Sequence, residues 1–368
     1  MARKRRGRGE GSIYQRKDGT WVANVSFGYR ANGRRIRKEV TGKTKKSVQE
    51  KLRAVMQQSG QADVTKMKLA EHLAIWLKSK KRKLAPGTYA NYERMIRLHI
   101  IPHIGHCVLA KLRPLHVSEM YTEIDEAGGS ANIQREVGSV LFSAMSQAVK
   151  LRLIESNPCH DIDRPRVEKP EMKIFSREQV DTFFEYAKDD DLYPLYVTAI
   201  ATAMRSGELY ALYWKDINFE TKSIHVQRSL EEIGGHQRLK PPKSSHSNRR
   251  IELPKFAMDV LHSHRKKALT EGLLDSPVFC DSNGGWLRRS NVARRSFHPL
   301  LKRAKLPRIR FHDLRHTAAT LLLLQGVHPK IVSERLGHAS IEITLNTYSH
   351  VLPSMQKAAA EKLDQLFG

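Results

Sequence analysis

The chain is poor in cysteine. Its three cysteines, Cys107, Cys159 and Cys280, lie far apart in 368 residues. An odd number at such distances excludes a disulfide framework and a cysteine-based zinc site, and it fits a reducing cytosol. The sequence has no run of about 18 uncharged apolar residues, so it predicts no membrane span. The basic start leads into no apolar segment, so we expect no secretory signal and a cytoplasmic location.

Acidic residues are also scarce relative to basic ones. There are 64 Lys and Arg against 38 Asp and Glu, which gives a formal net charge of +26. Such an excess points to a polyanionic partner, most often nucleic acid, although charge alone also fits a merely soluble basic protein. Hydrophobic residues make up 40% of the chain, which argues against wholesale disorder. The length allows two or three domains.

Several motifs of cofactor-dependent enzymes are missing. The chain has no GxxxxGK[ST] loop for a nucleotide and no HExxH metal motif. His312 and His316 lie one helical turn apart, but no clustered third ligand supports a metal there. The only carboxylate run, Asp189–Asp191, fits a solvated helix end better than a two-metal site. We therefore expect neither a metal nor a cofactor.

Basic residues are densest in the first 62 residues, and the pattern there is that of a small folded domain. Apolar and polar residues alternate over Trp21–Phe27, which is the period of a strand. Asn32 and Gly33 form a hairpin turn signal before a second strand candidate at 34–40. Thr44 can cap a helix that follows. Residues 1–62 thus read as three strands and a helix that bind phosphates, or as a small appendage without a ligand.

Residues 63–162 read as a helical bundle, and residues 163–173 as an extended, charged linker. The helices are expected over Leu69–Lys80, from Pro86, from Pro114 and from a cap at Ser130. The run Lys78–Lys83 fits a solvated loop and a nucleic-acid backbone contact equally well. Residues 174–368 mix strands with helices, so the fold class is α+β, mostly helical and multidomain.

In this last segment, Arg205 and Lys243 are candidate phosphate-binding residues. Arg205 lies in the largely apolar stretch TAMRSGELYAL, where an arginine needs an anionic partner. Taken alone, an ion pair with Glu208 three residues later explains it. Lys243 lies in the polar hairpin KPPKSSHSNRR between two strand candidates, and Lys240 competes with it for any role there.

The helix that starts near Phe311 carries a second group of candidates. His312 and Arg315 are three residues apart near its N-terminus, an end that favours anions, although a simply capped helix start also fits. His338 follows a glycine that ends a helix. Tyr348 lies on a short helix that Ser340 can cap, and without context it would be read as a packing residue.

The order of these residues strongly resembles that of the tyrosine recombinase (phage integrase) family. The surrounding motifs resemble that family too: MRSGEL, FHDLRHTAAT, RLGHAS and TYSHV. The layout resembles the mobile-element integrases of that family. The resemblance implies an arm-type DNA-binding domain over 1–62, a helical core-binding domain over 63–162 and a catalytic domain over 174–368. It therefore covers nearly the whole chain.

The resemblance implies a site-specific recombinase that integrates or excises a mobile element through a 3′-phosphotyrosine. It assigns six residues: Tyr348 as nucleophile, Arg205, Arg315 and His338 on the non-bridging oxygens, His312 assisting or accepting the tyrosine proton, and Lys243 protonating the 5′ oxygen. A type IB topoisomerase uses similar chemistry, and a DNA-binding regulator without catalysis is a further alternative. All six positions are filled, which argues against an inactive regulator.

The resemblance also implies partners. These are double-stranded DNA at core and arm sites, a homo-tetramer on that DNA, and accessory DNA-bending or directionality proteins in a bacterial host. Neither a metal nor ATP is needed. The C-terminal segment Pro353–Phe367 is an apolar helix candidate that either docks on a neighbouring subunit or folds back on its own domain.

Overall fold

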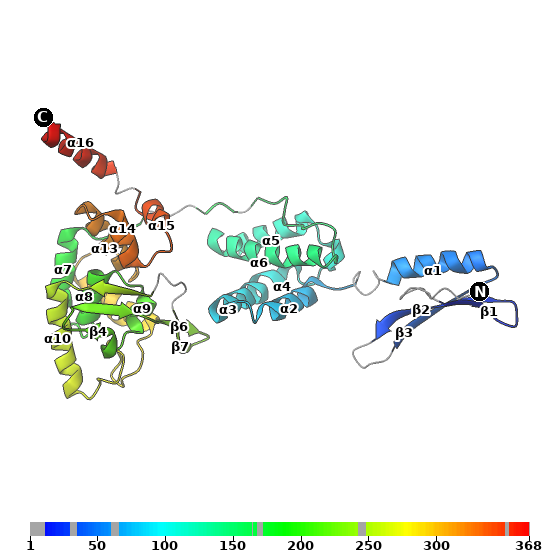
Figure 1. Ribbon diagram of the computed structural model, residues 1–368, viewed down its shortest axis with the longest axis horizontal. Coiled ribbons are helices and arrows are strands. Elements are labelled where there is room, and N and C mark those ends of the chain that lie inside the picture. Colours follow the sequence, from blue (N-terminus) through cyan, green and yellow to red (C-terminus); the bar gives the residue numbers. More distant parts are fainter. Residues whose placement is uncertain are drawn as a thin grey trace, which may run out of the picture. The chain divides into compact units, whose positions relative to one another are not determined.

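The computed structural model describes residues 12–29, 35–59, 66–163, 165–167, 172–241, 248–349 and 353–367. The chain forms two compact units, residues 1–168 and 169–368 (Figure 1). The division falls inside the segment expected to be a linker. In the described residues, no helix is both long and apolar enough to cross a membrane.

The first unit begins with a small antiparallel sheet covered by one helix. Its elements are β1 (Ser12–Gln15), β2 (Trp21–Tyr29), β3 (Arg35–Gly42) and α1 (Lys45–Ser59), with the strands in the order β1-β2-β3. Ala23 on β2 packs against Val48 and Leu52 of α1, and the neighbouring Val22 is fully buried as well. Thr44 accepts a hydrogen bond from the backbone N–H of Ser47 at 3.2 Å, as expected of a helix cap. The turn expected at Asn32 lies outside the described residues.

Helices make up the rest of the first unit. They are α2 (Leu69–Lys80), α3 (Pro86–Met95), the π-helical turn η1 (Ile96–Ile100), α4 (Ile101–Ile104), the 3₁₀ turn η2 (Leu109–Lys111), α5 (Pro114–Glu126) and α6 (Ala131–Lys150). Pro86 and Pro114 open their helices, and the Ser130 hydroxyl accepts from the N–H of Ile133, as the sequence predicts. His72 of α2 contacts the carbonyl oxygen of Ala144 in α6, which ties the two helices together in a single core.

The second unit combines helices with short strands, which confirms the α+β class. Its elements are α7 (Arg177–Ala187), α8 (Tyr193–Thr202), α9 (Ser206–Tyr210), η3 (Trp214–Asp216), β4 (Ile217–Asn218), β5 (Ser223–Val226), β6 (Ser229–Ile233), β7 (His236–Lys240), β8 (Arg249–Glu252), α10 (Lys255–Thr270), α11 (Arg289–Asn291), η5 (Val292–Phe297), α12 (His298–Arg303), α13 (Asp313–Leu324), α14 (Pro329–Leu336), α15 (Ile341–Thr347) and α16 (Pro353–Phe367).

The strands of this unit form two sheets, of order β4-β5-β8 and β6-β7. Within the polar segment between β5 and β8, residues 229–240 form the antiparallel β6–β7 pair. Gly234 and Gly235 both have positive φ angles, +57° and +81°, and this geometry closes a two-residue turn between antiparallel strands.

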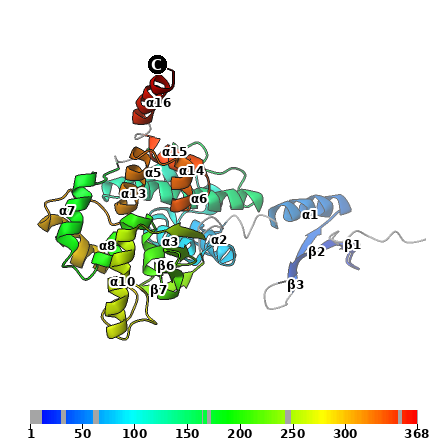
Figure 2. The same ribbon diagram turned by 60° about the vertical axis from the view of Figure 1, so that its left-hand side comes forward.

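Two apolar clusters position the helices of the second unit. The larger one includes an aromatic group in which Phe183 contacts the rings of Tyr196 and Phe297. The smaller one surrounds Tyr348 with residues of α13 and α14, including Ala319 and Leu336. Figures 1 and 2 show α13, α14 and α15 grouped together, in keeping with the packing of α14 against both neighbours.

Candidate active site

Arg205 lies between two helices of the second unit. Ala203 takes a left-handed conformation (φ 53°) that ends α8, and Arg205 then occupies the N-cap position of α9. Its guanidinium donates to Glu208 Oε1 at 2.9 Å, so the expected ion pair is present. It also donates to the carbonyl oxygen of Gly337 at 3.1 Å, 132 residues away. With 38% of its side chain exposed, Arg205 can still meet a ligand.

Arg315 is the buried counterpart of Arg205. It lies in the first turn of α13, is only 4% exposed, and donates to the carbonyl oxygens of Ala203 at 2.7 Å and Leu336 at 2.8 Å. Burial, followed by the charge of Arg205, lowers its pKa to about 9, so the group remains a cation at neutral pH. A buried cation needs fixed dipoles around it, and these two carbonyl groups supply them.

A third arginine, Arg249 at the start of β8, completes the arrangement. The three guanidinium groups donate to carbonyl oxygens of consecutive residues at the end of α14: Arg249 to Arg335 at 2.7 Å, Arg315 to Leu336 at 2.8 Å and Arg205 to Gly337 at 3.1 Å. A helix C-terminus leaves its last carbonyl groups without intrahelical partners and carries a partial negative charge. The end of α14 is therefore the scaffold on which the arginines gather.

Gly337 allows this close approach. Its φ angle of +66° is left-handed, which favours glycine and turns the chain out of α14. A Cβ atom at this position would also lie 2.9 Å from Nη1 of Arg249. A side chain here would therefore strain the backbone and push one arginine away from the helix end.

Glu208 links the arginines on their other side. It is 4% exposed and accepts from Arg205 and from Nη2 of Arg249, the latter at 2.9 Å. Burial alone would raise the pKa of this carboxyl, but the hydrogen bond and charge of Arg249, together with those of Arg205, hold the pKa below its usual range. Glu208 is thus an anion that keeps two cations in place.

We expect Arg249→Ala to lower the free energy of unfolding by about 2 kcal/mol, because it removes charge-assisted hydrogen bonds from a buried carboxylate. Urea denaturation followed by circular dichroism measures the change. The matched control is Lys255→Ala, which breaks an ion pair whose side chains are 84% and 58% exposed, and it should cost less than about 0.5 kcal/mol. Equal midpoints for both variants would contradict the bridging role.

Both predicted histidines lie beside this cluster. His338 follows Gly337 directly, and its Nδ1 lies 2.8 Å from the Thr344 hydroxyl of α15. Burial, together with Arg315 and Arg205, lowers its pKa to about 4, so the ring is neutral at neutral pH. His312 is exposed at the N-cap of α13 and makes no capping hydrogen bond; the protein around it and the charge of Arg315 lower its pKa to about 4.

Tyr348 ends α15 and is almost fully buried, with 1% of its surface exposed. Burial raises its pKa to about 12, although the charge of Arg315 acts in the opposite direction. Its hydroxyl lies 2.9 Å from Nδ1 of His316. The sequence pointed to His316 only as a weak metal candidate, and because 32 residues separate it from the tyrosine, no spacing rule predicts the contact. Ser340, expected to cap α15, makes no side-chain capping bond.

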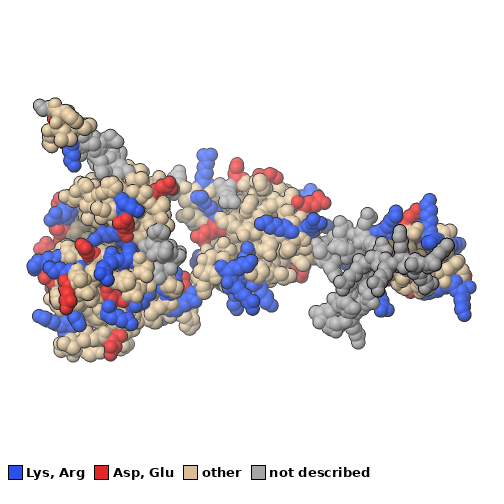
Figure 3. Space-filling model, viewed as in Figure 1, with Lys and Arg blue, Asp and Glu red and all other residues tan. Residues whose placement is uncertain are grey.

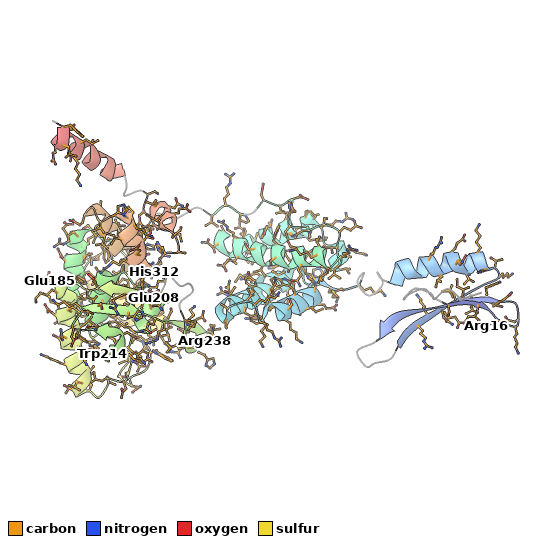
Figure 4. The ribbon with its side chains drawn as sticks, viewed as in Figure 1. Arg16, Glu185, Glu208, Trp214, Arg238 and His312 are labelled. Carbon is orange, nitrogen blue, oxygen red and sulfur yellow. The ribbon has the colours of Figure 1, made fainter. Side chains whose placement is uncertain are left out.

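The two lysine candidates have different positions. Lys243 lies outside the described residues. Lys240 ends β7, and its Nζ lies 2.7 Å from Glu231 Oε1. Lys240 lines a cavity of about 1020 Å³ together with Arg205 and His312. Figure 4 labels Glu208 and His312 on this side of the unit, and Figure 3 shows the many basic side chains on its surface.

A metal centre is not supported by the part of the chain that the structure describes. No group of three or more His, Cys, Asp or Glu side chains there could hold an ion. The rings of His312 and His316 are in contact, with centroids 5.3 Å apart, but His316 faces the Tyr348 hydroxyl. The site is an array of cations and neutral imidazoles around a phenol.

Two family models and several known proteins match this chain. The model of the phage integrase family matches residues 173–355, and that of the phage integrase N-terminal SAM-like domain matches residues 68–124. A tyrosine recombinase XerC-like protein of Caldanaerobacter subterraneus is 30% identical, over 93% of this chain and 95% of its own length. The ICEBs1 integrase of Bacillus subtilis is 28% identical, over 96% and 100%.

Solved structures show the same fold. The Tn1549 transposon integrase in complex with a circular intermediate DNA matches with a TM-score of 0.70 at 22% identity, over 81% of this chain and 99% of that one. A lambda integrase dimer bound to a core site matches with a TM-score of 0.61 at 17% identity, over 94% and 96%. The chain belongs to the phage integrase family of tyrosine recombinases. It is a DNA recombinase.

Proposed function

We propose that this recombinase integrates and excises a mobile element by attaching DNA covalently to Tyr348. The observation that supports the proposal most directly is the gathering of two cationic arginines, Arg205 and Arg315, with His338 at the end of the helix that also packs against Tyr348. The relatives named above are a tyrosine recombinase and an integrase, and neither is a topoisomerase or a regulator.

The chemistry follows from the needs of a phosphodiester. The phosphorus becomes more negative as a nucleophile adds, and fixed N–H donors stabilise that charge without reorganising. Arg205 and Arg315 supply such donors to the non-bridging oxygens, and His338 supplies an N–H from a neutral ring. Tyr348 attacks the phosphorus and forms a 3′-phosphotyrosine, while the 5′ oxygen leaves with a proton.

The same arrangement explains why we propose a reaction without metal or ATP. The two guanidinium groups provide the positive charge that a metal ion provides in two-metal nucleases. The phosphotyrosine bond is similar in energy to the phosphodiester that it replaces, so a 5′-hydroxyl from another strand can reverse the step. Strands are then joined to new partners with no external energy source.

Lys243 is the proposed donor of the leaving-group proton. Lys240, the alternative, is 25% exposed and already paired with Glu231. We expect Lys243→Ala to slow cleavage of ordinary DNA by about 100-fold or more, the usual contribution of a general acid. A substrate with sulfur in place of the 5′ bridging oxygen needs no proton on its leaving group and should restore the rate.

Lys240→Ala serves as the matched variant and should change cleavage less than about tenfold, since Lys240 is already paired with Glu231. Single-turnover cleavage on both substrates measures the effects. A large loss for Lys240→Ala that the sulfur substrate restores, with Lys243→Ala unaffected, would transfer the role to Lys240.

We further propose roles for the domains and partners. Residues 1–62 bind arm sites in double-stranded DNA, residues 63–162 and 174–368 bind core sites, and residues 163–173 link them. Four copies act on two duplexes, with accessory bending or directionality proteins, in the cytoplasm of a bacterial host. The apolar end of α16, where Leu363, Leu366 and Phe367 are exposed, is a candidate contact between copies. Deletion of residues 1–62 should weaken arm binding and leave core cleavage intact.

A nicked suicide duplex library tests the function. When the strand beyond the nick diffuses away, the attacking 5′-hydroxyl is lost and the covalent protein–DNA adduct accumulates. We expect an adduct with EDTA present and ATP absent, and sequencing at the junction identifies the core site. No adduct on any duplex would refute the proposal, while relaxation of plasmids without joining of two sites would favour a topoisomerase.

A further inference from the structure

The proton of Tyr348 must leave before or while its oxygen bonds to phosphorus. The proposed mechanism names no group in contact with that hydroxyl to receive it. We propose that His316 is a catalytic residue that accepts the phenolic proton of Tyr348 at Nδ1. This inference rests on the proposed function, because it assigns the proton acceptor for the same tyrosine.

The geometry distinguishes His316 from the other histidines. Its Nδ1 lies 2.9 Å from the Tyr348 hydroxyl, which is hydrogen-bond distance. The Nδ1 atom of His338 instead contacts Thr344. The ring of His312 instead meets the ring of His316 edge to face, with an angle of 86° between the ring planes. Since His316 directly follows Arg315, one helix presents both a phosphate-binding cation and the base.

The charges around His316 suit a base. On its own segment it is close to Asp313, Arg315 and Arg310, and it also lies near His312, His338 and Tyr348. Burial lowers the pKa of His316 below its ordinary value. The two arginines act in the same direction and Asp313 in the opposite one, so the ring is neutral at neutral pH and can accept a proton. In the tautomer with hydrogen on Nε2, the phenol donates to Nδ1.

Burial of Tyr348 keeps the phenol protonated when no DNA is bound, although the charge of Arg315 acts in the opposite direction. The pKa of Tyr348 is about 12, far above that of the imidazole, so the proton stays on the phenol. A bound phosphate adds negative charge beside the arginines, which raises the basicity of the ring. Bonding of the phenolic oxygen to phosphorus at the same time makes its proton more acidic. Transfer therefore occurs together with attack.

The step balances as follows. The O–H bond of Tyr348 breaks and its proton joins Nδ1 of His316, giving an imidazolium. The phenolic oxygen bonds to phosphorus, and the bond from phosphorus to the 5′ oxygen breaks. The 5′ oxygen takes a proton from the proposed donor, Lys243. In the reverse direction, a 5′-hydroxyl attacks phosphorus and gives its proton back to the neutral lysine, while the departing phenolic oxygen recovers its proton from the imidazolium.

A purely structural role for His316 makes a different prediction. His316→Asn places an amide near the position of Nδ1 that can still hold the Tyr348 hydroxyl but cannot take a proton. A mere anchor would therefore tolerate asparagine, whereas a base would not. His316→Gln, whose amide reaches further and corresponds to Nε2, is the second variant if the first folds poorly.

The test uses the full chain and a duplex that carries the core site recovered by trapping. We expect His316→Asn to bind this duplex like the wild type and to form the covalent adduct about 100-fold more slowly. The wild-type rate should rise with pH and level off once His316 is neutral. The variant rate should keep rising by tenfold per pH unit, because it depends on the small phenolate fraction.

The sulfur-substituted substrate distinguishes loss of the proton acceptor from loss of the proton donor. It needs no proton on its leaving group, so it should not restore the rate of His316→Asn. His262→Gln, on the exposed face of α10, is the control for a histidine replacement and should retain the wild-type rate and pH profile. If His316→Asn forms the adduct at the wild-type rate, or keeps the wild-type pH profile, the inference is overturned. It is also overturned if His312→Asn, and not His316→Asn, loses the plateau of the rate at high pH. An adduct by the wild type in either case keeps the proposed function intact.

Discussion

Tyr348→Phe is expected to eliminate covalent attachment to DNA, a loss of at least about 10⁴-fold, because no other group can take the place of the attacking oxygen. The phenyl ring retains the packing of Tyr348 against Ala319 and Leu336. Only the hydrogen bond to His316 is lost, at a cost of about 1 kcal/mol. The variant should therefore fold and bind DNA.

The adduct is measured by denaturing electrophoresis of a labelled suicide duplex, with binding followed in parallel by gel shift. Tyr186→Phe is the matched control, since the side chain of Tyr186 is exposed at the end of α7. It should form the adduct at the wild-type rate. An adduct that persists unchanged in Tyr348→Phe would show that another residue is the nucleophile.

Arg315→Ala has the second largest expected effect. Removal of one preorganised donor to a developing oxyanion costs about 10²- to 10³-fold in rate, and we expect the upper end because Arg315 is a buried full charge. The carbonyl groups of Ala203 and Leu336 lose their partner as well. We therefore also expect a loss of about 2 kcal/mol or more in the free energy of unfolding.

Arg315→Lys separates the two effects, because it keeps the charge but cannot span both carbonyl groups and the phosphate. It should recover part of the stability and remain about 10²-fold slow in single-turnover cleavage. Arg177→Ala, which removes an ion pair at an exposed position of α7, should leave both quantities unchanged. Full activity of Arg315→Lys would mean that charge alone, without the forked geometry, is sufficient.

Local sequence signals predicted most helices of the protein. Ser130 caps a helix as expected, and Pro86 and Pro114 begin theirs, because capping and proline geometry depend only on the residues next to them. The strands of the β6–β7 pair were not predicted. Their polar, charged composition hides the alternation that marks a strand with one buried face.

The family resemblance led from the sequence to the six candidate residues, and the structure brings four of them, Arg205, Arg315, His338 and Tyr348, to the end of α14. The supporting residues were harder to find. Glu208 was read only as the partner of Arg205, whereas it also holds Arg249. Nothing in the neighbouring sequence marked Arg249, which is followed directly by another arginine. Its role depends on the hydrogen bond to the carbonyl oxygen of Arg335, 86 residues away at the end of α14.

The sequence by itself determined the class of this protein, the starts of several of its helices and its candidate nucleophile, because motifs such as FHDLRHTAAT and TYSHV are read from neighbouring residues. Only the tertiary structure decided which groups touch. It placed three arginines on successive carbonyl groups of α14 and His316, not His312, against the Tyr348 hydroxyl. The physical reason is that burial and hydrogen bonding between distant segments select those contacts, and a linear pattern carries no record of which helix end is left with unpaired carbonyl groups.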